Sequence, residues 1–174
     1  MKKFLIFFAI GSLLLVAQSI WSVFFHTRSA PEFVFILVVF SGIYHKPFGG
    51  MILAFILGFM VDSLTGLLPG LFASIYTLTF VFCRLAGRRF YMRSYPFQVL
   101  IVLATTLLAK ILEYIVLNWL AERGHPGLAF FWPMWPLFVW NALAAIPLIG
   151  WLERTEQRLS DRYMHHVFEH RGFI

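Results

Sequence analysis

Residues 49–70 read GGMILAFILGFMVDSLTGLLPG, and Asp62 is the one charged side chain in that stretch. A segment this apolar needs either a protein core or lipid around it. Similar stretches recur along the chain, and 60% of its 174 residues are hydrophobic. A water-soluble domain of this size cannot bury that much apolar surface in one core. The sequence therefore predicts an all-α integral membrane protein with lipid as its solvent.

Apolar stretches on both sides of this one predict about six transmembrane helices in a compact bundle. The first run, residues 3–25, is long enough for a full span, which favours an uncleaved helix over a signal peptide with a cleavage site near Ala17. The second and third are short for a bilayer, so they form either two tilted spans or a hairpin shielded by other helices. The second to sixth segments lie at 33–44, 47–61, 68–83, 97–120 and 131–151.

Residues 1–151 thus form a predicted six-helix transmembrane domain, followed by a short amphipathic tail at 152–174. This tail is either an interfacial helix or an extension of the last span. With a cytoplasmic N-terminus, the outer loops hold only Arg28 and Arg123, and most other basic residues lie inside. The positive-inside rule therefore predicts that both termini, and the tail, are cytoplasmic.

The formal charge of +6 is explained by this topology and by anionic inner-leaflet lipid, so nucleic acid is not an expected partner. The stretch FWPMWPLFVWN places Trp132 and Trp135 at the outer end of the last span. Aromatic side chains there are typical of an interfacial anchor. A rigid outer rim that docks an extracytoplasmic partner is the functional alternative.

Asp62 belongs to a stripe of mostly small residues, Gly58, Asp62, Gly66 and Gly70, each four positions from the next. On a helix this spacing forms one face, where small residues let another backbone approach closely. Pro69 and Gly70 indicate that the helix has ended, so the stripe runs into an outer turn. Asp62 then either caps the following segment or serves partner docking or a cavity. Catalysis is the least expected role, because the neighbouring sequence offers no partner for an acid or base.

Lys110 and Glu113 lie in the fifth apolar segment and, three residues apart, on one helical face. Charges at the bilayer centre are costly, so we expect each to find a partner. One interpretation is an interior ion pair, which Asn141 of the sixth segment joins. The other is a polar cavity, a proton path or a contact with another membrane protein. His166 and His170 lack a third ligand, so no metal site and no cofactor is expected.

At this point the chain resembles the bacterial rod shape-determining MreD family. The likeness rests on GGMILAFILGFMVDSLTGLLPG, which looks like the family's glycine–aspartate–glycine segment after the third span. Length, basic N-terminus, six hydrophobic segments and short tail agree with it. By this resemblance Gly58, Asp62, Gly66 and Gly70 are the family-marking positions.

The resemblance implies a non-enzymatic scaffold of the cell-elongation machinery in the bacterial inner membrane. Its implied partners are MreC, the RodA glycosyltransferase, the elongation transpeptidase and MreB filaments. It also implies a bundle like the S components of energy-coupling-factor transporters, which bind vitamins. The alternative function is therefore a small-solute-binding transport component with an outward pocket near Asp62, Lys110 and Glu113, although the first span lacks an evident Ala-xxx-Ala pattern. An integral-membrane lipid enzyme ranks last.

Overall fold

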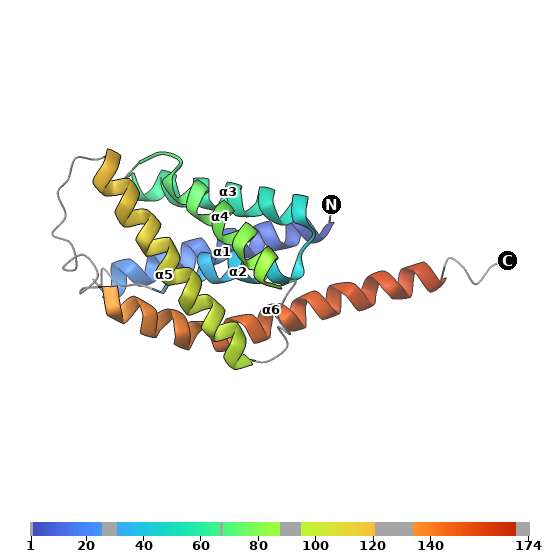
Figure 1. Ribbon diagram of the computed structural model, residues 1–174. Helices are drawn as coiled ribbons and strands as arrows, with labels where there is room; N and C mark the ends of the chain where they lie inside the picture. The colour runs from blue at the N-terminus through green and yellow to red at the C-terminus, as the bar shows by residue number, and fades with distance from the viewer. Residues whose placement is uncertain (1, 26–30, 67, 88–94, 121–133, 170–174) are drawn as a thin grey trace.

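The computed structural model describes residues 2–25, 31–66, 68–87, 95–120 and 134–169, and the regular structure of this part is entirely helical (Figure 1). Successive helices alternate in direction, so α1, α3 and α5 begin near the end of the bundle where α2 and α4 finish. The helices are α1 (Lys2–Phe25), α2 (Phe33–Tyr44), α3 (Pro47–Thr65), α4 (Leu71–Gly87), α5 (Tyr95–Leu120) and α6 (Trp135–Glu169).

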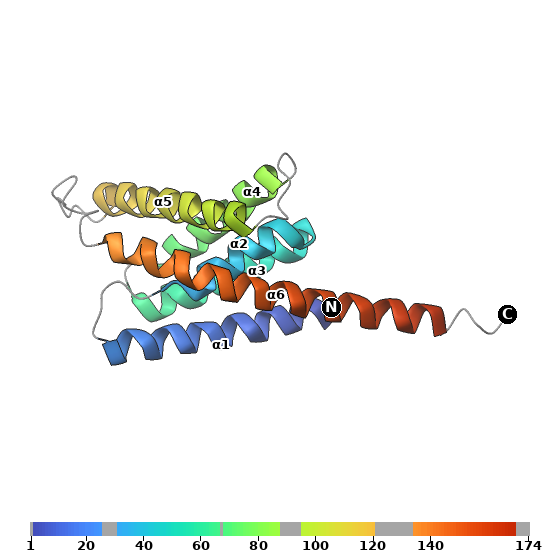
Figure 2. The same cartoon turned by 90° about the horizontal axis from the view of Figure 1, so that it is seen from below.

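α2 is the centre of the bundle, and the other helices surround it (Figure 2). Its sequence, FVFILVVFSGIY, has no polar face, and every residue from Val34 to Gly42 is buried. A helix that is apolar all round is stable only where apolar groups contact it on every side. Here those groups belong to α1, α3, α4, α5 and α6.

α2 has only 12 residues, which correspond to about 18 Å, less than the thickness of a bilayer core. Protein groups meet the backbone at both of its ends. The Glu32 N–H donates to Asn141 Oδ1 at 2.9 Å, and Arg84 donates to the His45 carbonyl oxygen at 2.9 Å. A short helix is therefore accommodated because its ends are satisfied inside the bundle rather than exposed to lipid.

α3 is longer than the apolar stretch 47–61 predicts, because the helix continues through Asp62 to Thr65. Its start follows from Pro47, which holds Lys46 in an extended conformation and occupies the first helical turn. Its end follows from Gly66, which is left-handed. α6 likewise continues past residue 151 to Glu169, so the backbone of the tail extends the last helix.

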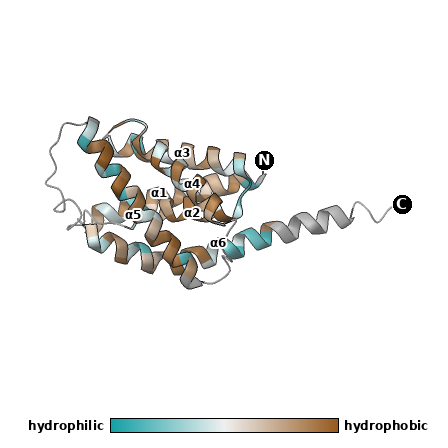
Figure 3. Cartoon of the chain, in the orientation of Figure 1, coloured by the Kyte–Doolittle hydropathy of each residue, from teal (hydrophilic) through white to brown (hydrophobic). Residues whose placement is uncertain are grey.

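In the part of the chain that the structure describes, α1, α3, α5 and α6 are long and apolar enough to cross a membrane, and α2 and α4 are shorter apolar helices. Figure 3 shows hydrophobic residues along the bundle and hydrophilic residues on α6 where it leaves the bundle. The fold is thus all-helical, with several helices suited to a bilayer. The number of spans stays a prediction.

Candidate functional site at the α3–α4 turn and the buried lysine cluster

The Asp62 carboxylate caps the N-terminus of the following helix, α4. Asp62 lies in the last turn of α3 and is 6% exposed. Its Oδ2 accepts the N–H groups of Gly70 at 3.1 Å and Ala73 at 3.0 Å. Its Oδ1 accepts the N–H of Phe72 at 2.8 Å. Both carboxylate oxygens are therefore engaged in hydrogen bonds to backbone groups of α4 and the residue before it.

α4 needs this cap because its own sequence does not supply one. The first N–H groups of a helix have no partner within the helix and are usually satisfied by the side chain of the residue before it. Gly70 occupies that position and has no side chain. A carboxylate also interacts favourably with the positive end of the helix dipole, and bonds to a charged acceptor are stronger than neutral ones. Asp62 thereby joins α3 to α4.

Two glycines make the turn between these helices possible. Gly66 has φ +61° and donates its N–H to the Asp62 carbonyl oxygen at 3.0 Å, which ends α3. Gly70 has φ +90°. Residues other than glycine are strained at such values of φ, because their Cβ atom crowds the backbone. The chain can therefore reverse within a few residues and bring the start of α4 back to Asp62.

Gly58 lets the backbones of α3 and α4 meet. A Cβ at Gly58 would lie 2.6 Å from both the Ala73 Cα and the Phe72 carbonyl oxygen. These are backbone atoms, which cannot rotate away. All four positions of the glycine–aspartate motif are therefore in the α3–α4 hairpin: Gly58 at the helix contact, Asp62 at the cap, Gly66 and Gly70 in the turn.

We expect Gly58→Ala to destabilise the protein by about 1–3 kcal/mol, the usual cost of forcing extra volume into a packed contact. The matched control is Gly49→Ala on the same helix, where a Cβ meets no atom within 4 Å. The measurement is thermal unfolding of both purified variants in detergent. Equal melting temperatures for the two variants would contradict the close helix contact.

Lys110 is the centre of a second buried site, halfway along α5. Its Nζ lies 2.8 Å from Glu113 Oε2 on the same helix and 2.8 Å from Glu32 Oε1 before α2. Lys110 and Glu113 are buried, with Lys110 7% exposed, and Glu32 is partly buried. Two carboxylates share one ammonium group, so each charge has a partner in a region where an isolated charge is costly.

Asn141 on α6 adds neutral hydrogen bonds to this cluster. Its Oδ1 accepts the Glu32 N–H, and its Nδ2 donates to Thr106 Oγ1 on α5 at 3.3 Å. Asn141 is fully buried. The lysine cluster, defined as Glu32, Thr106, Lys110, Glu113 and Asn141, therefore links the start of α2 to α5 and α6.

Glu32 is the member of the lysine cluster that the sequence analysis does not predict. The available signal was its place directly after Pro31 and before the wholly apolar run of α2, the position of a helix N-cap. For Asp62, capping of the following segment was one of the roles that the sequence left open. The sequence could not select this role, because backbone N–H groups leave no trace in a residue pattern.

The other predicted positions add no chemistry to these two sites. Trp135 starts α6 and is exposed, whereas Trp132 lies outside the described residues. Among the residues that the structure describes, no three His, Cys, Asp or Glu side chains are arranged to hold a metal ion. The side chains of His166 and His170 are likewise outside the described set.

Apolar helices of membrane-spanning length, with buried charges that tie one helix to another, define a multi-pass membrane protein. The model of the family described as rod shape-determining protein MreD matches residues 1–158. The chain belongs to the MreD family, and this membership gives it a role in rod shape determination. Comparisons with curated proteins and with solved structures gave no match.

Proposed function

We propose that this chain is a non-enzymatic membrane scaffold of the bacterial cell-elongation machinery. It binds MreC and, with it, holds the RodA glycosyltransferase, the elongation transpeptidase and MreB filaments at one place. It lies in the inner membrane with both termini in the cytoplasm. Family membership supports the role in shape, and the geometry of the family motif supports the scaffold mechanism.

The observation that carries the proposal is the state of Asp62. An acid that accepts three backbone N–H groups and is almost fully buried is poorly placed to exchange a proton with a substrate. What the motif builds is a fixed hairpin of α3 and α4. Docking through this hairpin, rather than through the Asp62 carboxylate itself, is the role that we assign to Gly58, Asp62, Gly66 and Gly70.

The hairpin presents an apolar face to its surroundings. Phe48, Phe55 and Phe59 are each more than half exposed, and their spacing places them along one side of α3. Such a face suits lipid or the transmembrane helix of a partner. MreC-like bitopic proteins offer one such helix, which is why we place MreC here.

Co-purification from the protein's own cells tests the scaffold function. A tagged chain, solubilised in mild detergent, is expected to bring down MreC and at least one cell-wall synthase, identified by mass spectrometry. A variant with Phe55→Ala and Phe59→Ala is expected to recover less MreC than a control with Leu13→Ala and Val16→Ala on the exposed side of α1. Recovery of no synthesis partner, together with a retained small ligand, would contradict the scaffold proposal.

Cysteine labelling in intact cells is expected to place Arg28→Cys outside and Arg93→Cys inside. The physical reason is the excess of basic residues in the loops assigned to the cytoplasm. The native Cys83 is fully buried, so it contributes little background labelling. Labelling of position 93 without position 28 by an impermeant reagent would invert the topology.

A second candidate function, binding of a small solute, is favoured by one cavity. A pocket of about 380 Å³ lies beside the lysine cluster, lined by Gln18, Ser22, Glu32 and Lys110 among others. Its lining is evenly divided between apolar and polar side chains, and the polar ones offer hydrogen-bonding groups that could orient a solute. This is the arrangement that a likeness to S components would require. Retention of a small molecule by the purified chain, detected by mass spectrometry, would favour this function.

A further inference from the structure

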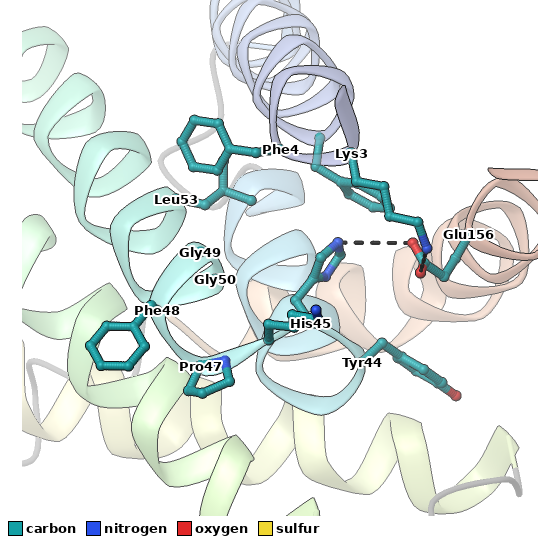
Figure 4. Close-up of a pocket in the computed structure, with 12 residues that line it drawn as sticks. Lys3, Phe4, Tyr44, His45, Pro47, Phe48, Gly49, Gly50, Leu53 and Glu156 are labelled. Carbon is teal, nitrogen blue, oxygen red and sulfur yellow. Dashed lines mark hydrogen bonds and ion pairs between the residues drawn. The ribbon is translucent and has the colours of Figure 1, made fainter. Parts of the chain in front are cut away.

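A larger pocket, of about 810 Å³, lies at the opposite end of the bundle, between the first turns of α1 and α3 (Figure 4). Its lining is divided. Phe4, Phe7 and Leu53 form an apolar wall between the two helices, and Lys3, His45 and Lys46 lie where the helices begin. The pocket is therefore amphipathic along its length.

The polar end of this pocket carries a net positive charge. Lys3 Nζ is paired with Glu156 Oε1 on α6 at 2.8 Å, so these two charges balance. Lys46, which is exposed, has no partner among the described residues. One ammonium group is thus left over at the pocket mouth, where an anion would neutralise it.

His45 adds ring nitrogens without hydrogen-bond partners to the polar end of the pocket. Both ring nitrogens and Glu156 Oε2 are buried without a hydrogen-bond partner, although His45 Nε2 lies 3.9 Å from Glu156 Oε2. Burial lowers the pKa of His45, an effect that Glu156 opposes and Lys3 reinforces. The ring is therefore mainly neutral at neutral pH, with one donor and one acceptor nitrogen.

The start of α3 points the same way. Lys46 is its N-cap residue and makes no side-chain cap hydrogen bond. Pro47 has no N–H, but the N–H groups that follow it in the first turn have no acceptor within the helix. These groups and the positive end of the helix dipole favour an anion at this position. Together with the unpaired Lys46 ammonium, they make the pocket mouth an anion-binding region next to an apolar groove.

We propose that this pocket binds an anionic phospholipid, with its phosphate at Lys46 and the α3 N-terminus and an acyl chain along Phe4, Phe7 and Leu53. A soluble anion would use only the polar end and leave the apolar wall in water. A zwitterionic lipid would bring a positive headgroup to the polar end of the pocket, which is already positive. An anionic lipid satisfies both ends, and basic pockets between transmembrane helices are known to take such headgroups.

The test uses the purified full chain in detergent and measures its melting temperature as lipid is added. Phosphatidylglycerol is expected to raise the melting temperature, whereas phosphatidylcholine and inorganic phosphate at equal concentration are not. An equal rise with phosphatidylcholine would show that the pocket does not select charge. A rise with inorganic phosphate alone would show an anion site without an acyl groove. Either result would overturn the proposal.

Two variants locate the effect. Gly49 lines the pocket, and a Cβ there meets no atom within 4 Å, so Gly49→Leu begins in open space and adds apolar volume at the pocket. It is expected to fold, because leucine favours a helix over glycine, and to lose the response to phosphatidylglycerol. Lys46→Gln is expected to raise the phosphatidylglycerol concentration needed for half-saturation by roughly fivefold, the effect of one basic residue near an anionic headgroup.

The matched control is Arg154→Gln, which removes an exposed basic residue of α6 that does not line the pocket. It is expected to respond as the unmodified chain does. An unchanged response in both Lys46→Gln and Gly49→Leu would overturn the proposal. Should Gly49→Leu fail to fold, the Lys46→Gln titration and native mass spectrometry of lipid retained by the unmodified chain decide it. Equal retention of phosphatidylglycerol and phosphatidylcholine would then count against the site.

Discussion

Asp62→Ala is expected to lower the free energy of unfolding by at least about 2 kcal/mol and to cost cells their rod shape. The substitution leaves the N–H groups of Gly70, Phe72 and Ala73 without their acceptor. Buried donors that lose a partner each cost about 1–3 kcal/mol, and loss of a helix cap alone costs about 1 kcal/mol. The measurements are thermal unfolding in detergent and the morphology of a chromosomal mutant strain.

Two further variants separate the loss of the Asp62 cap from a general effect of substitution in this turn. Ser63→Ala, next in the chain and exposed, is expected to leave stability and shape unchanged, since its hydroxyl donates only to the carbonyl oxygen of Phe59 in its own helix. Asp62→Asn keeps one acceptor oxygen and should fall between Asp62→Ala and the unmodified chain. Normal cell shape and an unchanged melting temperature in Asp62→Ala would show that the cap contributes to neither stability nor function.

Lys110→Met is expected to destabilise the protein by about 3–5 kcal/mol, the usual result of removing one partner from a buried ion pair. Methionine has a similar shape but leaves the carboxylates of Glu32 and Glu113 facing each other without a cation. The expected remedy is graded. Adding Glu113→Leu should restore part of the stability, and adding Glu32→Gln should restore more.

The graded series distinguishes charge balance from packing. Glu32→Gln removes a charge but keeps the backbone N–H that donates to Asn141, so the start of α2 stays attached to α6. Arg154→Met, at an exposed arginine of α6 that lines neither of the two pockets described above, is the control and should cost little. The readout is the melting temperature of each purified variant. A triple variant less stable than Lys110→Met alone would show that these charges do not hold one another.

Much of the fold was predictable because hydropathy and chain-breaking residues act locally. The predicted helical class agrees with the structure, and Pro47 starts α3 where the sequence places it. The end of α3 at Thr65 and the start of α4 at Leu71 lie a few residues beyond the predicted bounds of 61 and 68. The central place of α2 was not predictable. A wholly apolar helix suits a protein core and a bilayer equally well, so hydropathy alone cannot tell which of the two surrounds it.

The candidate sites were likewise predictable only in part from the sequence. The spacing of Lys110 and Glu113 indicated a contact, because three residues along a helix fix two side chains on one face. Glu32 was not predictable as a third member. Its contact with Lys110 depends on how deeply α2 sits beside α5, and depth is a property of the assembled bundle.

The sequence by itself determined that this chain belongs in lipid, roughly where its helices begin and end, and that Asp62 is unusual within its glycine stripe. Only the tertiary structure decided what Asp62 does. The reversal at Gly66 and Gly70, together with the close approach at Gly58, brings the free N–H groups of α4 to its carboxylate. Composition and periodicity describe single segments, whereas a hydrogen-bond partner depends on how two segments are rotated and placed against each other.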